Sequence, residues 1–217
     1  MAYPAGVTRL SRSESQARTR ELLVATARTM FLRDGYSATS LEKVAEEAGF
    51  SKGAVYSNFD GKDALCLAVL DTLHRDVADA VLGSFSGAVT LDEALATFDL
   101  WAEARLGDPD WSALEAEFAA RSRRDPELRA ALEERNLRIR RMIADALRTT
   151  CERHGLTLPM DEDDLASALL SLGIGLGVQR ALNPELRVQV LSDVIRVMAG
   201  LPALGGSTTP ASSDTPV

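Results

Sequence analysis

Apolar residues recur three and four positions apart along most of the chain, the spacing of helices that bury one face. Leu23, Ala27, Met30 and Phe31 follow this spacing clearly, and no segment shows the sustained two-residue alternation of a strand. The pattern predicts an all-α fold of about nine helices. The helices are expected to begin near residues 14, 41, 52, 62, 91, 111, 126, 162 and 184.

Polar residues, glycine and proline mark the expected ends of these helices. Gly35 is expected to stop the first helix in a left-handed conformation, and Thr39 with Glu42 has the spacing of a capping box for the second. Ser51 is placed to cap the third helix, directly after Gly49 ends the second. Later starts are signalled by Thr90 with Glu93, by Asp125-Pro126-Glu127, by Asp161 and by Asn183-Pro184-Glu185.

The two short helices on either side of Gly49-Phe50-Ser51 form a helix-turn-helix candidate. Val55 and Phe59 are four residues apart and are expected to pack inward. A helix that enters the major groove of DNA needs small residues at its leading end and outward donors. Ser51, Lys52, Gly53 and Ala54 stand at the leading end, and the residues left to face outward are Lys52, Gly53, Tyr56, Ser57 and Asn58.

The net charge of −8 would by itself argue against a nucleic-acid partner, but the charge is unevenly distributed. Residues 1–60 carry eight Lys and Arg against seven acidic residues, whereas residues 61–217 carry 16 against 25. The amino-terminal region is therefore locally basic on an acidic protein. That distribution suits contact with phosphate groups.

Several other classes of protein fit the sequence poorly. No apolar run approaches the roughly 20 residues of a spanning helix, and the first residues lack the apolar stretch of a signal peptide, so we expect a cytoplasmic protein without a membrane segment. Cys66 and Cys151 are too few for a thiolate metal site. The acidic run Asp161-Glu162-Asp163-Asp164 lacks the alternating ligands of a calcium loop. We expect no metal, no cofactor and no catalytic machinery.

Residues 14–66 resemble the DNA-binding domain of the TetR (tetracycline-repressor-like) transcriptional regulators. The resemblance lies in a set of residues at fixed spacing: Phe31, Gly35, Tyr36, Thr39, Ser40, Val44, Ala45, Ala48, Gly49, Phe50, Ser51, Gly53, Tyr56, Phe59, Lys62 and Leu65. It covers about a quarter of the chain. The remainder is similar to the family in its helical pattern, its length and the segment Arg124-Asp-Pro-Glu-Leu-Arg129.

The resemblance implies roles for individual residues. Lys52 and Gly53 would meet base edges, while the groups expected to hold phosphates are Thr39, Ser40, Tyr56, Asn58 and Lys62. Two positions depart from the family pattern, because Asn58 stands where His is frequent and Asp60 adds an acid beside the phosphate-contacting residues. With few base-reading donors, specificity is expected to rest partly on DNA shape and on Arg9, Arg12 or Arg18 in a minor groove.

The expected domain organisation has four parts. Residues 1–13 form a flexible basic arm, 14–61 the DNA-binding domain, 62–201 a helical ligand-binding and dimerisation domain, and 202–217 a disordered tail. Aromatic and Met residues at helical spacing are usually core, but some could line a small-molecule pocket in the central helices. The candidates are Phe98, Trp101, Trp111, Phe118 and Met142.

The helix expected at 162–182 is apolar on every side, which requires cover on more than one face. The last helix offers a second broad apolar surface, so we expect a homodimer in which both helices meet their copies. The expected interface residues are Leu169, Leu172, Gly173, Leu176, Gly177, Leu191, Val194, Ile195 and Met198.

Together these features predict a homodimeric regulator that binds a pseudo-palindromic double-stranded DNA operator and responds to a small-molecule effector. Repression is the expected outcome, with activation as the alternative. Two rival classes, a helical enzyme and a purely structural dimer module, would show no DNA affinity. The sequence alone does not name the operator, the regulated genes or the effector.

Overall fold

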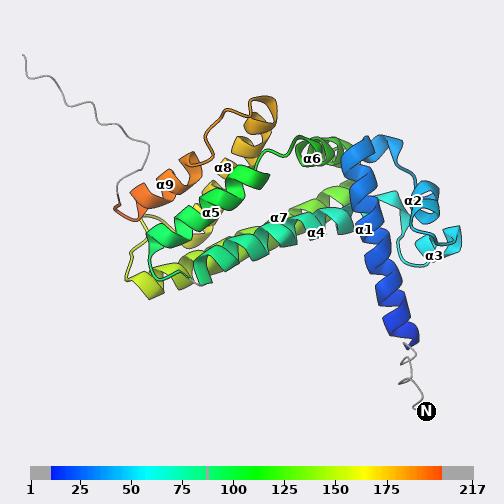
Figure 1. Ribbon diagram of the computed structural model, residues 1–217, viewed down its shortest axis with the longest axis horizontal. Helices are drawn as coiled ribbons and strands as arrows, with labels where there is room; N and C mark the ends of the chain where they lie inside the picture. Colours follow the sequence, from blue (N-terminus) through cyan, green and yellow to red (C-terminus); the bar gives the residue numbers. More distant parts are fainter. Residues whose placement is uncertain (1–10, 87, 202–217) are drawn as a thin grey trace, which may run out of the picture. The chain divides into compact units, whose positions relative to one another are not determined.

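The computed structural model describes residues 11–86 and 88–201, and over these residues it contains helices, turns and loops but no strand (Figure 1). The prediction of an all-α fold is therefore confirmed. The nine helices of this part of the chain are α1 (Arg12–Ala38), α2 (Leu41–Glu47), α3 (Lys52–Tyr56), α4 (Gly61–Ser86), α5 (Leu91–Arg105), α6 (Pro109–Ser122), α7 (Pro126–His154), α8 (Glu162–Leu182) and α9 (Val190–Met198).

The helices form two compact units. The described part of the first unit comprises residues 11–77 and 109–135, and that of the second comprises 78–86, 88–108 and 136–201. Both α4 and α7 contribute to the two units. The domain limit expected between residues 61 and 62 divides the chain differently, since α6 packs on α1 inside the first unit. The extent of the DNA-binding domain remains a prediction.

Local signals set both ends of α1. The hydroxyl of Ser11 accepts a hydrogen bond from the Glu14 N–H (3.2 Å), and the Glu14 carboxylate accepts one from the Ser11 N–H (2.7 Å), which forms a capping box. Gly35 breaks the helical geometry with φ 83 and ψ 167, a combination essentially restricted to glycine. The expected interruption at Gly35 is confirmed, although helical residues continue to Ala38.

The second helix begins at Leu41 as predicted, but its predicted capping box is wrong, and so is the predicted start of the last helix. Ser40 caps α2 by accepting from the Lys43 N–H (3.3 Å), whereas Thr39 is buried and donates its hydroxyl to the Gly35 carbonyl (3.0 Å). The capping box of Thr39 with Glu42 therefore does not form. The last helix begins at Val190 and not after Asn183-Pro184, because the intervening turns bury Val188 in the core.

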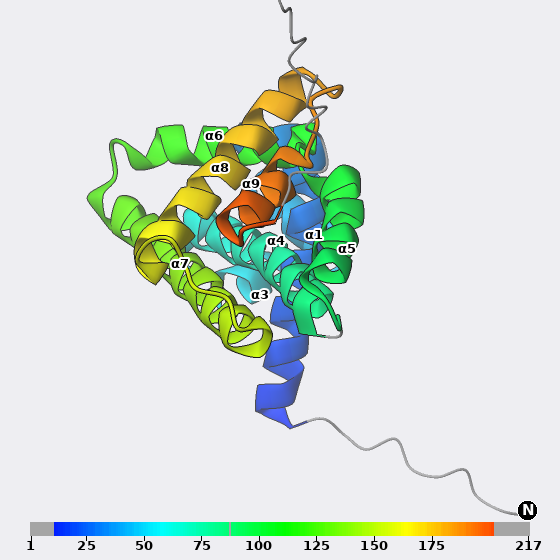
Figure 2. The same cartoon turned by 90° about the vertical axis from the view of Figure 1, so that its left-hand side faces the viewer.

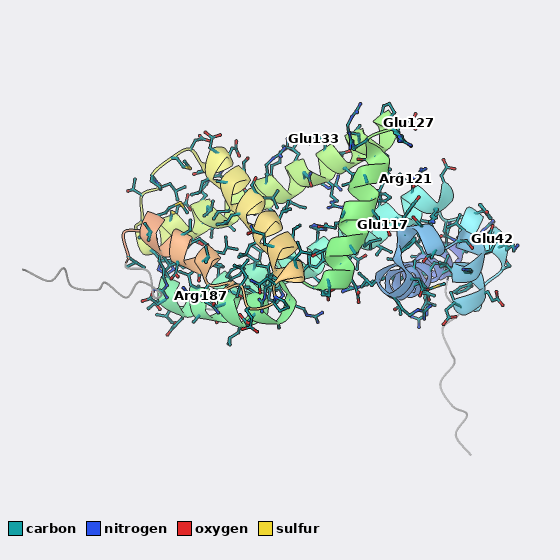
Figure 3. All side chains as sticks on the ribbon, turned by 90° about the horizontal axis from the view of Figure 1, so that it is seen from above. Glu42, Glu117, Arg121, Glu127, Glu133 and Arg187 are labelled. Atoms are coloured by element: carbon teal, nitrogen blue, oxygen red, sulfur yellow. The ribbon has the colours of Figure 1, made fainter. Side chains whose placement is uncertain are left out.

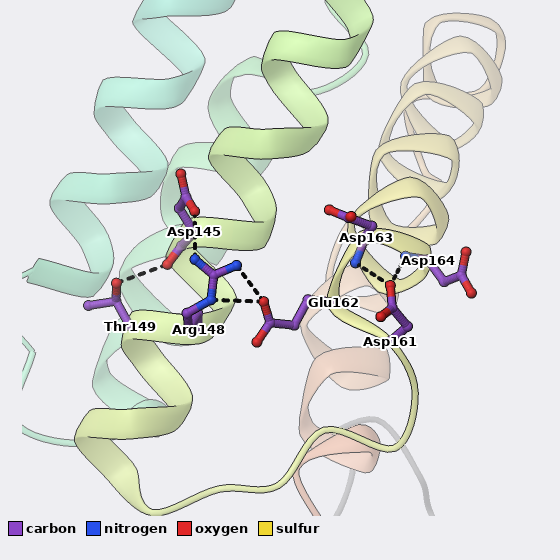
Figure 4. A network of polar contacts seen from close by, with 7 residues as sticks. All are labelled: Asp145, Arg148, Thr149, Asp161, Glu162, Asp163 and Asp164. Carbon is purple, nitrogen blue, oxygen red and sulfur yellow. Dashed lines mark hydrogen bonds and ion pairs between the residues drawn. The ribbon is translucent and has the colours of Figure 1, made fainter.

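Three other predicted starts are confirmed. Thr90 forms its capping box with Glu93, and Asp125 accepts from the first N–H groups of α7. Asp161 Oδ1 accepts from the N–H groups of Asp163 (2.9 Å) and Asp164 (3.4 Å) at the start of α8 (Figure 4). Glu162 pairs with Arg148 of α7 (2.6 Å), so this acidic run caps α8 and joins it to α7.

The core of the first unit forms where α1 to α4 meet α6 and the start of α7. Its large, fully buried side chains include Phe31 of α1, Val44 of α2, Val55 of α3 and Phe118 of α6. Phe118 packs edge-on against Tyr36, with 5.4 Å between the ring centroids. Residues more than 80 positions apart in the sequence therefore share one core.

A polar cluster lies within the same unit. Glu115 Oε1 lies 3.1 Å from His74 Nε2 and 3.2 Å from Arg135 Nη2, and the Trp111 ring meets the His74 ring edge-on. Burial raises the pKa of Glu115, but its contacts with His74 and Arg135 outweigh burial and bring the pKa below its ordinary 4.5. The carboxylate is thus stabilised in its charged form.

The second unit has its own core of α5, α8 and α9, with partly buried residues of α4 and α7 packed against it (Figure 2). Phe98, Leu165 and Val188 are among its buried residues. Arg180 of α8 pairs with Glu103 of α5 (2.6 Å), and Arg196 of α9 pairs with Asp92 of α5. These two ion pairs therefore join α8 and α9 to acidic residues of α5.

Part of the dimer interface expected from the sequence lies inside this core. Leu169, Leu176, Gly177 and Leu191 are buried within their own unit. The other five expected interface residues are half-buried: Leu172, Gly173, Val194, Ile195 and Met198.

Different apolar residues are exposed on the last two helices. We call them the exposed apolar face, and they are Ile174, Val178 and Leu182 of α8 with Val190 and Val197 of α9. Leu182 is 85% exposed. The expectation that no apolar run approaches a spanning length is wrong, because α8 has 21 residues and a mean hydropathy of 1.4 over its most apolar 18.

A glycine in the second unit provides a test of the close approach between α8 and the end of α5. A Cβ on Gly107 would lie 2.6 Å from Arg180 Cβ, and Gly107 has φ +86. We expect Gly107→Ala to lower the free energy of unfolding by about 2–4 kcal/mol. Gly155→Ala is the matched control, because Gly155 has φ +63 but open space around it, and should cost only about 1 kcal/mol. Urea denaturation measures both, and equal losses would contradict the proposed contact.

The lowered pKa of Glu115 gives a pH dependence with a definite sign. A carboxylate whose pKa is lower in the folded state stabilises the protein above its unfolded pKa, and this contribution is lost as the pH falls through the folded value. We therefore expect wild type to lose more stability than Glu115→Gln between about pH 6 and pH 3. Denaturant titrations at the two pH values measure the difference, and parallel losses in both proteins would refute the assignment.

Candidate nucleic-acid interface

The helix-turn-helix is built by α2, a glycine turn and α3. Gly49 has φ 73 and lets the chain reverse, and the Phe50 N–H donates to the Ala45 carbonyl (2.8 Å). The Ser51 hydroxyl then accepts from the Ala54 N–H (3.2 Å) and starts α3. Lys52 and Gly53 follow at its exposed leading end, as the sequence predicted.

The inner side of α3 is held by apolar contacts. Val55 and Phe59 are buried in the core of the first unit, which confirms their predicted inward packing. Arg20 of α1 lies over the Phe59 ring, 4.2 Å from its centroid, and donates to the Asn58 carbonyl (2.6 Å). Arg20 of α1 therefore holds the two residues Asn58 and Phe59, which follow the end of α3.

Three of the expected DNA-contacting side chains already have partners within the chain. The exposed Tyr56 donates its hydroxyl to Glu42 Oε1 (2.8 Å), and this hydrogen bond raises the pKa of Tyr56. Ser57 and Asn58 both donate to the Ala54 carbonyl at the end of α3. Any phosphate contact by these groups must compete with those hydrogen bonds.

Thr39 and Ser40 occupy different environments. Ser40 is half-buried at the start of α2, where the free N–H groups of the helix also point. Thr39 is 2% exposed and its hydroxyl donates to the backbone of α1, so in this structure it serves the core and not the surface.

Lys62, the expected phosphate contact of α4, lies against the end of α1. Its ammonium group sits over the Tyr36 ring, 4.1 Å from the centroid, and donates to the Ser37 carbonyl (3.3 Å). Partial burial lowers the pKa of Lys62. The cation is thus held at the start of α4, where free N–H groups can share an anion with it.

The neighbour of Lys62 connects this region to α6. Asp63 accepts two hydrogen bonds from Arg121, Nε to Oδ1 at 2.8 Å and Nη2 to Oδ2 at 2.7 Å, and a further one from the Tyr36 hydroxyl. The hydrogen bonds from Arg121, with a smaller contribution from Tyr36, lower the pKa of Asp63 despite partial burial. Glu117, one turn before Arg121, accepts from the Ser37 N–H (3.2 Å).

Sequence reasoning missed Glu117 and Arg121 as members of this region. They are more than 50 residues from Asp63 and belong to a helix that the sequence assigned to the ligand-binding and dimerisation domain, far from the helix-turn-helix. Figure 3 shows them one turn apart along α6. No local pattern marks an Arg on an exposed helix face as the partner of a particular distant Asp.

The five expected pocket residues are divided between the units. Trp111 and Phe118 belong to the first unit, where Phe118 is fully buried. Phe98, Trp101 and Met142 belong to the second, where the rings of Phe98 and Trp101 lie 5.8 Å apart. Phe118 and Phe98 are core residues of their own units.

Two family models match the chain. Residues 23–69 match the model of bacterial regulatory proteins of the tetR family, and residues 92–199 match the model of the carboxyl-terminal part of BetI-type transcriptional repressors. The first match contains α2, α3 and the start of α4, and the second extends from α5 to α9.

Curated relatives carry related names. The chain is 37% identical to the HTH-type transcriptional regulator TtgR of Pseudomonas putida over 69 residues, which are 32% of each protein. It is 29% identical to the HTH-type transcriptional repressor Rv1474c of Mycobacterium tuberculosis over 143 residues, 64% of this chain and 70% of that protein. The matches to YuxN of Bacillus subtilis and to TtgR span only 18% and 32% of those relatives.

Solved structures share the fold. A TetR-family regulator structure from Rhodococcus sp. aligns with a TM-score of 0.68 at 22% identity, covering 84% of this chain and 99% of that one. The reduced form of NemR from E. coli aligns with a TM-score of 0.66 at 21% identity, covering 85% and 100%. The motif in the sequence, the two family models and the fold agree, and the chain belongs to the TetR family of helix-turn-helix transcriptional regulators.

Proposed function

We propose that the protein represses transcription by binding a pseudo-palindromic operator as a homodimer, and that a small-molecule effector weakens this binding. The observation that carries the proposal is the leading end of α3, where Lys52 and Gly53 are exposed above the buried Val55 and Phe59. The name of the relative Rv1474c as a transcriptional repressor supports repression, with activation as the alternative.

Contacts with DNA divide into two groups in this proposal. Lys52 and Gly53 meet base edges, because the short side chains at the start of α3 allow close approach to the groove floor. Ser40, Tyr56 and Lys62 hold phosphates and set the register of the helix. Exposed Arg12 and Arg18 on α1 extend the basic surface, while Arg9 lies outside the described residues.

The dimer in this proposal uses the exposed apolar face of α8 and α9. A symmetric pair that buries Ile174, Val178 and Leu182 with their copies would remove exposed apolar surface from water and place four helices at the seam. Burial in this dimer interface would also explain why α8 is as long and as apolar as a membrane span. Two DNA-binding units related by a two-fold axis then match half-sites about 34–36 Å apart.

An effector acts in this scheme only through its different affinity for two conformations of the dimer. Typical couplings of about 1–3 kcal/mol correspond to changes of about 5- to 150-fold in affinity. Phe98, Trp101 and Met142 remain candidates for its binding site in the second unit. The proposal includes no catalytic reaction. It places the protein in the cytoplasm, because the matching family model describes bacterial regulatory proteins and bacterial DNA lies there.

Substitution of the two lysines separates the proposed contacts. We expect Lys52→Ala to reduce the preference for operator over unrelated DNA, because it removes a donor that faces bases. Lys62→Ala should weaken binding to all sequences and reduce the slope of log affinity against log salt by about one unit. Fluorescence anisotropy at several salt concentrations measures both, with Arg187→Ala in the second unit as a control for the loss of charge. An unchanged slope for Lys62→Ala would refute its phosphate contact.

A charged substitution on α8 tests the dimer seam. Val178→Asp places a carboxylate in the proposed interface, where burial without a partner costs several kcal/mol, so the dimer dissociation constant should rise by about 100-fold or more. Leu100→Asp on α5 is the matched control, because Leu100 is 77% exposed and lies outside the proposed seam. Sedimentation velocity measures the oligomeric state. A Val178→Asp protein as dimeric as the control would show that the seam lies elsewhere.

A further inference from the structure

We propose that Arg121 of α6 is a positioning residue for DNA binding: it occupies the Asp63 carboxylate and thereby leaves the Lys62 cation available to a phosphate. The proposal rests on the phosphate contact of Lys62 and adds a residue outside the helix-turn-helix to the binding machinery. Arg121 itself is not assigned a contact with DNA.

An unpaired Asp63 carboxylate would compete with a DNA phosphate for the Lys62 cation. Lys62 and Asp63 are adjacent at the start of α4, and each charge favours ionisation of the other. A carboxylate beside a lysine lowers the positive potential that a phosphate meets there. An unpaired Asp63 would therefore weaken the phosphate contact by attracting the ammonium group of Lys62.

The ion pair between Arg121 and Asp63 prevents this competition. Arg121 uses two N–H groups in a fork that matches both Asp63 oxygens, at 2.7 and 2.8 Å. The Tyr36 hydroxyl takes a further position on Oδ1. The acceptor sites of Asp63 that face α1 and α6 are thus filled by donors other than Lys62.

While Arg121 binds Asp63, the Lys62 side chain contacts the end of α1. Its ammonium group lies on the face of the Tyr36 ring, whose hydroxyl is bound to Asp63, and it donates to the Ser37 carbonyl. The hydrogen bond to Ser37 is exposed to water, so a phosphate can compete for the ammonium group there. Glu117 fixes the same turn of α1 by accepting from the Ser37 N–H. Arg121 therefore holds the start of α4, and Glu117 holds the end of α1, against which the Lys62 side chain lies.

The test measures operator affinity and its salt dependence for the full-length protein. Arg121→Ala should lower affinity about fivefold at low salt, the upper range for a partly exposed charge pair. It should also reduce the salt slope by up to about one unit, because Lys62 is then partly neutralised. Arg124→Ala is the matched control: Arg121 and Arg124 both line a surface pocket beside Tyr36 and Ser37 and both are exposed, but the structure gives Arg124 no contact with Asp63. It should change affinity less than about twofold.

A rescue experiment separates this mechanism from a purely structural ion pair. Adding Asp63→Asn to Arg121→Ala removes the competing carboxylate, so affinity and salt slope should return to near wild-type values. Asp60→Asn removes a different exposed acid beside the phosphate-contacting residues, so it should raise affinity by the same factor with and without Arg121. In a Lys62→Ala background, Arg121→Ala should have little further effect, because the residue through which it acts is already absent.

Several outcomes would overturn the proposal. These are no rescue by Asp63→Asn, a gain from Asp60→Asn that is larger in the Arg121→Ala protein than in wild type, an effect of Arg124→Ala as large as that of Arg121→Ala, or additive losses from Lys62→Ala and Arg121→Ala. Circular dichroism melts identify variants that lose affinity by unfolding. If Arg121→Ala unfolds, Asp63→Asn alone decides: affinity at or above wild type supports the mechanism, and lower affinity from a folded protein overturns it. An unchanged salt slope for Lys62→Ala would instead refute the phosphate contact itself.

Discussion

The burial of Val55 and Phe59 beneath α3 is the contact on which the proposed DNA-binding surface depends. A helix of five residues has almost no stability of its own, so its orientation comes from the core it covers. With these two side chains fixed against α1 and α2, Lys52, Gly53 and Tyr56 must face outward. The packing of Val55 and Phe59 therefore decides which side chains of α3 are exposed to solvent.

Polar contacts refine what this apolar core establishes. Ser40 and Ser51 begin the two short helices, and Arg20 holds the end of α3 through its backbone and the Phe59 ring. Each contact is modest in energy, since most are exposed to water. Their combined effect is geometric, because they restrict a short helix to one position relative to α1.

The first unit also contains a helix that lies far along the chain. Phe118 of α6 is fully buried beside Tyr36, and Arg121 and Glu117 contact residues on either side of Lys62. Because α6 shares a core with α1 to α4, it can influence the proposed DNA-binding helices without any flexible linker. The α6 contacts therefore connect the proposed phosphate contact to residues outside the helix-turn-helix within one compact unit.

The sequence by itself determined the all-α fold, the glycine turn between α2 and α3, the inward packing of Val55 and Phe59 and the caps at Ser51, Thr90, Asp125 and Asp161. These features depend on residues within about one or two helical turns of each other, where spacing and cap chemistry act directly. Only the tertiary structure decided that Thr39 is buried, that Arg121 pairs with Asp63, and which apolar residues of α8 are exposed. Those outcomes depend on which distant helix covers each face, and an apolar helix such as α8 offers several equivalent faces to its neighbours.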